Sequence, residues 1–281
     1  MNLYIIGNGF DLDLGLQTSY NSFIQSEDFK KLLAKSSSNN LASHINNYFK
    51  RQKDQWCDLE ITLGSYVNEF CNVHPDVLKS QFAELKSELK NYLKKQSANL
   101  SFENQVNSRS FKLLNIIFEG ILNQTETTVL NFNYTDTVKL GLHYINNGQV
   151  LEMGTLKYIN PHGTLSTDIA LGVNDDFLRD GGRAYSYLRK AYSYNYNLNH
   201  WTKTYQRANK IFIFGHSLSI VDSDILHPMF EYYLEDRSIG RTITILDTKD
   251  SNDRINDKIS ELTSGKIASF KLDNEILINP F

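Results

Sequence analysis

The first eleven residues constrain the fold of this chain more than any other stretch. A short apolar run from Leu3 to Ile6 is followed directly by Gly7-Asn8-Gly9. A strand that ends at two closely spaced glycines lets the backbone adopt positive φ and approach a ligand, as it does where proteins hold nucleotide phosphates. The fingerprint G-x-G-x-x-G needs a third glycine that this turn lacks, since the next one is Gly15. The turn therefore indicates either a phosphate site or a tight strand-to-helix connection that binds nothing.

Composition limits the class of protein. The chain has 281 residues, of which 41% are hydrophobic and 22% charged, and this balance is typical of a soluble globular protein with a sizeable core. The formal net charge of −3 argues against a broad nucleic-acid surface, although a local basic patch stays possible. No apolar run approaches the ~18 residues of a membrane span, and no basic signal region precedes the first strand. We therefore expect a cytoplasmic protein without a membrane contact.

The cysteine count excludes one kind of metal site. Cys57 and Cys71 are the only cysteines, so the chain cannot build a four-cysteine zinc ribbon or a disulfide framework. We expect no metal.

Apolar residues recur at helical spacing from about Phe29 to Asn123, and no strand pattern interrupts them. We expect helices on both sides of a break near residues 36–40, one after Trp56, one that starts at Pro75 and one over residues 111–121. Glu60 falls within the apolar stripe of the helix after Trp56, so its carboxylate must be paired or must face a polar cleft. These residues predict an almost wholly helical insertion over about 27–124.

The second half of the chain alternates strands with helices, which predicts a parallel sheet. The fold class is therefore α/β, a Rossmann-like parallel sheet with a helical layer inserted after the first strand, and the α/β core comprises residues 1–26 and 125–281. Asp222 is expected to cap a helix, and another helix is expected near residues 253–262. The expected strands, with the first of them central, are Met1–Ile6, Thr127–Phe132, Ile169–Val173, Ile211–Phe214, Thr242–Leu246 and Ile267–Leu272.

Polar residues follow two of these strands, and a histidine lies on a loop between them. Asn131 and Asn133 bracket the end of one strand, Gly215-His216-Ser217 follow another, and His162 stands between a proline and a glycine. In open α/β sheets, ligands bind outside the carboxyl ends of strands, so we expect these residues to line one cleft. An asparagine pair is equally typical of a turn. His162 and Asn133 are expected on loops and outside the core.

A tyrosine-rich segment over about 182–210 also contains arginine and lysine. Such a mixture could stack nucleic-acid bases, but helical packing with tyrosines at the rim is the favoured interpretation. The sequence therefore gives no strong nucleic-acid signal.

Three groups of motifs together carry a family resemblance. They are Ile6-Gly7-Asn8-Gly9-Phe10-Asp11 with Leu14-Gly15-Leu16 and Thr18-Ser19-Tyr20, then Trp56-x-Asp58-x-Glu60, and Phe214-Gly215-His216-Ser217-Leu218. In these motifs the chain resembles the bacteriophage abortive-infection AbiH family, and the likeness covers residues 1–281 as a single domain. More distantly, the same junctions resemble the SIR2 (sirtuin-like) NAD-binding fold, which has a Gly-rich first turn, a Thr-x-Asn-x-Asp strand end, a His-Gly catalytic loop and a Gly-x-Ser nucleotide contact.

The SIR2 resemblance implies a role for each candidate residue. Gly7 and Gly9 would contact the pyrophosphate, Asn133 would position the nicotinamide ribose or a water, and His162 would be the general base. Ser217 would contact the adenosine ribose. The other cofactor contacts that it implies are Asn8, Asp11, Tyr134, Thr135, Gly215, His216 and Asp222, with Glu60 and Asp136 around the site.

Two positions depart from the SIR2 pattern. Thr135 stands where the pattern has an aspartate, with Asp136 one place later, and Asn131 stands where it has a threonine. The group that would hold the nicotinamide carboxamide is therefore not defined by the motif.

The resemblance implies an anti-phage effector of the bacterial cytoplasm that binds NAD and cleaves it to nicotinamide and ADP-ribose. Protein deacylation is not expected, because the zinc ribbon that deacylating sirtuins use is missing. One alternative is a non-catalytic sensor of NAD or ADP-ribose that regulates a partner, which the Thr135 departure favours. The other is a nuclease toxin in which Asp11, Asp13 and Glu60 gather Mg²⁺. A phage-derived trigger or partner protein and a homo-oligomer are both compatible with the sequence.

Overall fold

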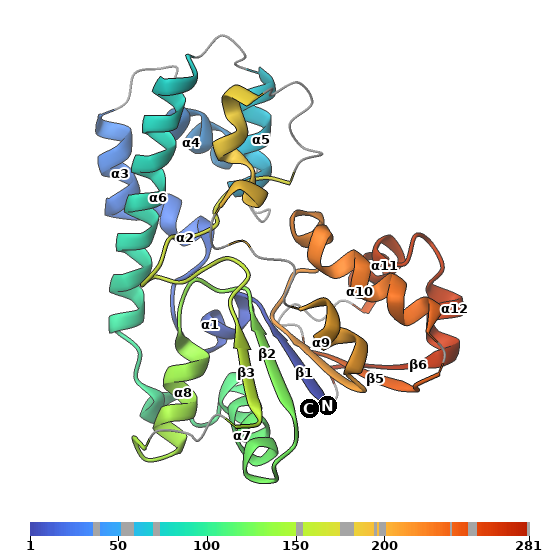
Figure 1. Ribbon diagram of the computed structural model, residues 1–281. Coiled ribbons are helices and arrows are strands. Elements are labelled where there is room, and N and C mark those ends of the chain that lie inside the picture. Colours follow the sequence, from blue (N-terminus) through green and yellow to red (C-terminus); the bar gives the residue numbers. More distant parts are fainter. Residues whose placement is uncertain are drawn as a thin grey trace. The chain divides into compact units, whose positions relative to one another are not determined.

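The computed structural model describes residues 1–35, 40–51, 59–69, 74–149, 154–174, 183–193, 196, 201–236, 238–246 and 252–279. The chain divides into two compact units (Figure 1). The sheet unit comprises Met1–Gly15, Leu100–Pro161 and Asn197–Phe281, and the helical unit comprises Leu16–Asn99 and His162–Tyr196. Two residues of the family motif, Trp56 and Asp58, lie outside the described residues.

The sheet unit is built on an all-parallel sheet, which confirms the predicted α/β class. Within the described residues it has six strands in the order β3-β2-β1-β4-β5-β6 (Figure 1). The first strand lies inside the sheet between β2 and β4, as its apolar sequence predicts, since a parallel strand buried on both faces reads as a continuous apolar run. The strands are β1 (Asn2–Ile6), β2 (Thr127–Asn131), β3 (Leu156–Ile159), β4 (Lys210–Phe214), β5 (Arg241–Leu246) and β6 (Asn274–Ile278).

Helices cover both faces of this sheet because the chain moves outward from its centre in two directions. It runs from β1 to β3 one way and from β4 to β6 the other way, and crossovers of the same right hand then place the helices on opposite faces. The helices of the sheet unit are α1 (Gly9–Asp13), η1 (Phe102–Gln105), α7 (Arg109–Leu122), α8 (Thr137–Ile145), α9 (Thr202–Arg207), η5 (Ile220–Asp222), α10 (Ser223–Glu235), α11 (Asn252–Leu262) and α12 (Ile267–Asp273).

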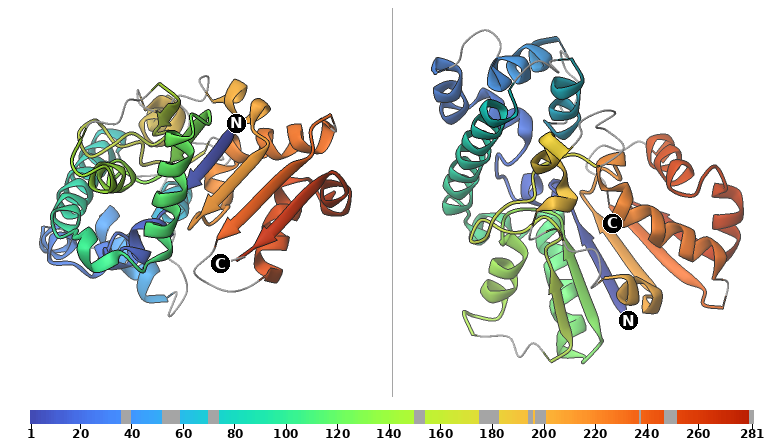
Figure 2. Two further views of the ribbon diagram at one scale, coloured as in Figure 1. Left: turned by 90° about the horizontal axis from the view of Figure 1, so that it is seen from below. Right: turned by 45° about the horizontal axis from the view of Figure 1, so that its top comes forward.

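Each face has its own helix layer. On one face, α7 and α8 pack over Tyr4, Ile6 and Val129. Helices α10, α11 and α12 pack against one another, and α12 contacts β6 (Figure 2).

The helical unit confirms the helical reading of the N-terminal third of the chain. Its longest helix, α6, begins at Pro75, which suits the first turn because proline lacks an N–H that would have no partner there. The buried face of α6 carries Leu78, Phe82, Leu85, Leu89, Tyr92 and Leu93 at steps of three and four. The elements of this unit are α2 (Tyr20–Gln25), α3 (Glu27–Ala34), α4 (Leu41–Arg51), α5 (Leu59–Glu69), α6 (Pro75–Ala98), η3 (Arg183–Leu188) and η4 (Lys190–Tyr192).

Two predicted strands are wrong. The segment Ile267–Leu272 lies in the helix α12, and the strand is the next segment, β6, which pairs with β5. The segment Ile169–Val173 is no strand either, and only Val173 forms a bridge, with Arg189. Short apolar runs fit both a helix face and a strand, so pairing with a neighbouring strand decides between them.

The two units overlap with the predicted insertion without coinciding with it. The insertion was expected over about 27–124, whereas α7 is grouped with the sheet unit and His162–Tyr196 with the helical unit. A segment that is distant in the sequence thus completes the helical unit.

Candidate functional site

The glycines that follow β1 pack directly against the loop that follows β4. A Cβ atom on Gly7 would lie 2.5 Å from the Cα of His216, and one on Gly9 would lie 2.5 Å from the Cα of Gly215. The N–H of Gly7 donates to the Phe214 carbonyl and that of Gly9 to the Gly215 carbonyl, both at 2.9 Å. A side chain at either position would collide with the backbone of the β4 loop. The close contact between the β1 turn and the β4 loop therefore explains why both residues are glycine.

Four N–H groups of the β1 turn and α1 that could hold a phosphate already have acceptors within the protein. Besides Gly7 and Gly9, the N–H of Phe10 donates to the Gly7 carbonyl at 3.0 Å and that of Leu12 to the Asn8 carbonyl at 3.1 Å. A pyrophosphate can take the N–H groups of Gly7 and Gly9 only if the contact between the β1 turn and the β4 segment opens. The predicted phosphate role of Gly7, Asn8 and Gly9 stays a prediction.

Substitution of Gly215 by alanine is expected to destabilise the sheet unit by about 2 kcal/mol or more. The residue has φ +61°, and its new Cβ would lie 2.5 Å from the Cα of Gly9, a backbone atom that cannot rotate away. Chemical denaturation measures the loss. Gly240→Ala is the matched control, because its Cβ would meet nothing within 4 Å; equal stability of the two variants would contradict the packing argument.

The end of β2 forms a buried network of side-chain amides. The Asn131 amide donates to the Thr135 carbonyl at 3.0 Å, and the Asn131 side-chain oxygen accepts from the Asn133 N–H at 3.2 Å. The Asn133 amide in turn donates to the Gly7 carbonyl at 3.2 Å. Asn133 is only 7% exposed, so the expectation that it lies outside the core is wrong. It fastens the β2 loop to the β1 turn.

Asp11 lies behind this loop and has no exposed surface. Its two carboxylate oxygens accept hydrogen bonds from the hydroxyls of Thr135 and Thr137, each at 2.6 Å. Burial raises the pKa of Asp11 to about 6, against the opposing effect of hydrogen bonds from Thr135, Thr137 and Asn133. Asp11 thus supports the loop from within, and Thr137, which the sequence analysis missed, is one of its two anchors. The sequence signal for this role is the pair of threonines at alternate positions, Thr135 and Thr137, shortly after the end of β2.

His216 orders the β4 loop. Its Nδ1 accepts from the Leu218 N–H at 3.0 Å, so Nε2 carries the proton and faces the Asp222 carboxylate at 3.3 Å. Its ring packs edge-on against Phe132 with centroids 4.4 Å apart. Asp222 stands at the N-cap position of α10 but makes no capping hydrogen bond there, which corrects the expected cap, because its carboxylate faces the histidine instead.

The loop presents Ser217 to solvent between two residues with positive φ. Gly215 has φ +61° and Leu218 has φ +51°, and Leu218 itself is buried. A leucine in this conformation is uncommon and is held by the surrounding contacts. Ser217 is exposed, whereas its neighbours His216 and Leu218 are buried.

Two further predicted residues belong to the loop between β2 and α8. Tyr134 is buried, and Asp136 lies 3.9 Å from the Lys139 ammonium, which also sits 4.4 Å over the ring of Tyr158. Asp136 thus has a partly exposed carboxylate at the start of α8.

His162 belongs to the helical unit. It is 7% exposed, its ring stacks on Tyr196 with centroids 6.0 Å apart, and its carbonyl accepts from the Ala170 N–H at 2.8 Å. The following Gly163 has φ +73°, which a tight turn requires. The histidine does lie on a loop, but the expectation that it stays outside the core is wrong, since an aromatic neighbour covers it.

Glu60, on α5 of the helical unit, forms a buried ion pair. Its carboxylate lies 2.8 Å from the ammonium of Lys190, and the two side chains are 4% and 0% exposed. The sequence predicted that the Glu60 carboxylate is either paired or faces a polar cleft, and in the structure it is paired. Its position in the site stays a prediction.

The residues of the predicted common cleft belong to two different units. Gly7, Asn133 and Ser217 belong to the sheet unit, and His162 belongs to the helical unit. Their meeting in one site therefore stays a prediction.

The three carboxylates of the nuclease alternative each have other partners. Asp11 is bound by two threonines, Asp13 accepts from the Ser110 N–H at 2.7 Å, and Glu60 pairs with Lys190. Among the residues that the structure describes, no group of three or more His, Cys, Asp or Glu side chains is arranged to hold a metal ion.

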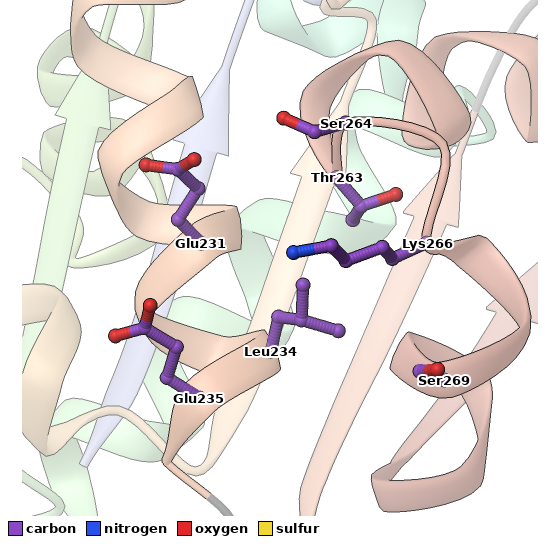
Figure 3. A pocket seen from close by; sticks show the side chains of 7 residues that line it. All are labelled: Glu231, Leu234, Glu235, Thr263, Ser264, Lys266 and Ser269. Atoms are coloured by element: carbon purple, nitrogen blue, oxygen red, sulfur yellow. The ribbon is translucent and has the colours of Figure 1, made fainter.

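A cavity of about 380 Å³ lies elsewhere in the sheet unit, between α10 and the turn from α11 to α12 (Figure 3). The ammonium of Lys266 extends toward the wall that carries Glu231 and Glu235, and all three residues are exposed. Such hydrated, polar walls are unlike the largely apolar lining of most ligand pockets. None of the predicted site residues lines this cavity. Its lining is Glu231, Leu234, Glu235, Thr263, Ser264, Lys266 and Ser269.

A comparison with protein families decides the relationship. The family model described as bacteriophage abortive infection AbiH matches residues 3–241. The chain belongs to the AbiH family. The match spans β1 to the start of β5 and so includes every candidate residue, which places this AbiH chain among proteins of bacteriophage abortive infection. A search of curated proteins and a search of solved structures found no match.

No helix in the described part of this AbiH chain combines the length and the apolar character needed to cross a membrane.

Proposed function

We propose that this AbiH chain is an abortive-infection effector that binds NAD at the carboxyl ends of β1, β2 and β4 and hydrolyses it. The observation that carries the proposal is the strand order β3-β2-β1-β4-β5-β6 in an all-parallel sheet. In this order the chain reverses direction between β1 and β4, and sheets of this kind bind dinucleotides at that point. The turns after β1 and β4 carry Gly7, Gly9 and Gly215, and Asn133 follows β2.

The reaction that we propose needs few groups. The bond between the ribose C1′ and the nicotinamide nitrogen breaks, and its electron pair leaves with neutral nicotinamide. Water attacks C1′, and its proton passes to a base, for which we propose His162. Asn133 would position the ribose or the water. The products are nicotinamide, ADP-ribose and one proton.

The test uses the purified full-length chain and NAD, with chromatography for nicotinamide and ADP-ribose. We expect the two products in equal amounts. A chain that binds NAD by calorimetry but releases neither product would reject hydrolysis and support a sensor.

One observation favours that second candidate, a nucleotide sensor. The hydroxyl of Thr135, at the position where SIR2 proteins have an aspartate, donates to Asp11 inside the protein. It is therefore not directed at a ligand, which removes one group that catalysis would use to hold the carboxamide.

A further inference from the structure

Asp11 connects the two chain segments that carry the proposed site. It stands at the start of α1, directly after the β1 turn, and its carboxylate holds Thr135 and Thr137 of the β2 side at 2.6 Å each. The Thr135 carbonyl accepts the Asn131 amide, and the Asn131 oxygen accepts the Asn133 N–H. A continuous set of hydrogen bonds therefore leads from Asp11 to Asn133.

Asn133 closes this network onto β1. Its amide donates to the Gly7 carbonyl at 3.2 Å, while the Gly9 N–H donates to the Gly215 carbonyl at 2.9 Å. A ligand that takes over the Asn133 N–H that donates to Gly7, or the Gly9 N–H, must displace these internal partners. Binding through these groups therefore requires their internal contacts to open.

Among the residues that the structure describes, no cation forms an ion pair with the buried Asp11 carboxylate. The causes that act on its pKa are burial, which raises it to about 6, and hydrogen bonds from Thr135, Thr137 and Asn133, which lower it; no positive charge is among them. A buried charge held by hydrogen bonds alone is costly, and opening the network to water relieves that cost.

The groups near Asp11 in the described part of the chain do not supply a positive charge that would balance its carboxylate. Tyr158 of β3 has a pKa well above its ordinary value through burial and the charges of Asp136 and Asp11, so its hydroxyl stays protonated. Asp13 on α1 is bound to the N–H of Ser110 at the start of α7. The titratable and charged groups on the elements that pack here include Asp13, Asp136, Lys139 and Tyr158. The helix α7, which contacts α1, also carries Arg109, Lys112 and Glu119, and α8 carries His143.

The direction of the pH effect follows from linkage. A hydrated aspartate ionises near pH 3.8, and the buried Asp11 only near pH 6. Protons therefore favour the closed network, and its stabilisation is lost progressively as the pH rises from about 4 to about 6, after which it is constant. The difference between these two pKa values corresponds to an increase of about a hundredfold in the equilibrium constant for opening between low and neutral pH.

We propose that Asp11 is a positioning residue that couples opening of the site to pH. Its protonated side chain keeps the β1 turn and the β2 loop closed, and its ionisation makes them open more readily at neutral pH. NAD binds the opened arrangement, so the affinity for NAD rises with pH. The part of this inference that concerns NAD rests on the proposed function, and the part that concerns opening does not.

The experiment follows two quantities from pH 4.5 to 7.5 in the full-length chain. Amide hydrogen exchange, corrected for the intrinsic pH dependence, reports opening at residues 7–11 and 131–137, and calorimetry reports NAD affinity. We expect both the opening equilibrium and the affinity to increase more than tenfold over this range. In Asp11→Asn, which keeps the shape and a hydrogen-bond acceptor but has no charge, both should be constant.

Asp13→Asn is the matched control on the same helix, and it should behave like the unmutated chain. Exchange that is independent of pH in the unmutated chain, or equally dependent in Asp11→Asn, overturns the proposal. An NAD affinity that is constant while opening changes overturns the claim that opening precedes binding. If opening depends on Asp11 but NAD binds at no pH, the coupling stands and the proposed function fails.

Discussion

Replacement of Lys190 by methionine is expected to lower the free energy of unfolding by about 3–5 kcal/mol. The Lys190 side chain is fully buried and its ammonium lies 2.8 Å from Glu60. Methionine keeps most of the volume but removes the ammonium that lies against a buried carboxylate, and breaking a buried ion pair by removing one partner is strongly destabilising. Urea denaturation of the purified chain measures the change.

The double variant Glu60→Leu with Lys190→Met separates charge from packing. Since replacing both members of a buried pair by apolar groups is often neutral or stabilising, it should recover most of the lost stability. Lys30→Met is the surface control in the same unit, because Lys30 pairs with Glu27 while both side chains stay largely exposed. We expect at most about 1 kcal/mol from it. A loss equally small in Lys190→Met would show that the buried pair is not needed for stability.

His162→Asn is expected to reduce NAD cleavage by about 10²–10⁴-fold, the usual effect of losing a general base. This prediction holds within the proposed function, in which His162 takes the proton of the attacking water. Asparagine is chosen over alanine because His162 is 7% exposed and stacks on Tyr196, so a truncated side chain would leave a void. The measurement is the initial rate of nicotinamide release, with thermal unfolding to verify the fold.

His143→Asn, at an exposed position on α8, is the matched control and should keep full activity. The NAD affinity of His162→Asn should change little, because the proposed role is in the chemical step. Undiminished nicotinamide release from His162→Asn would remove this histidine from catalysis. Asn133 is a poorer test, since its substitution also breaks the hydrogen bond to Gly7.

Elements with one strong local pattern could be predicted from the sequence. Helix α6 has a proline at its first position and apolar residues at steps of three and four, so neighbouring side chains alone identify it. The strand β1 is an apolar run ended by glycines, and it lies inside the sheet as predicted. The segment Ile267–Leu272 has no such pattern, and its apolar residues fit a strand as well as a helix. It is a helix because the next residues, Asn274–Ile278, form the strand that pairs with β5, and this pairing cannot be seen in the local sequence.

The sequence by itself determined which residues form the turns at the carboxyl ends of β1, β2 and β4, and the family to which the chain belongs, because these depend on residue identity and local spacing. Only the tertiary structure decided what the residues contact. Gly7 and Gly9 are glycines because the β4 loop lies against them, and Asp11 is enclosed by threonines more than a hundred residues away. Burial and partners such as the Glu60–Lys190 pair arise when distant segments come together, and no local pattern encodes that distance.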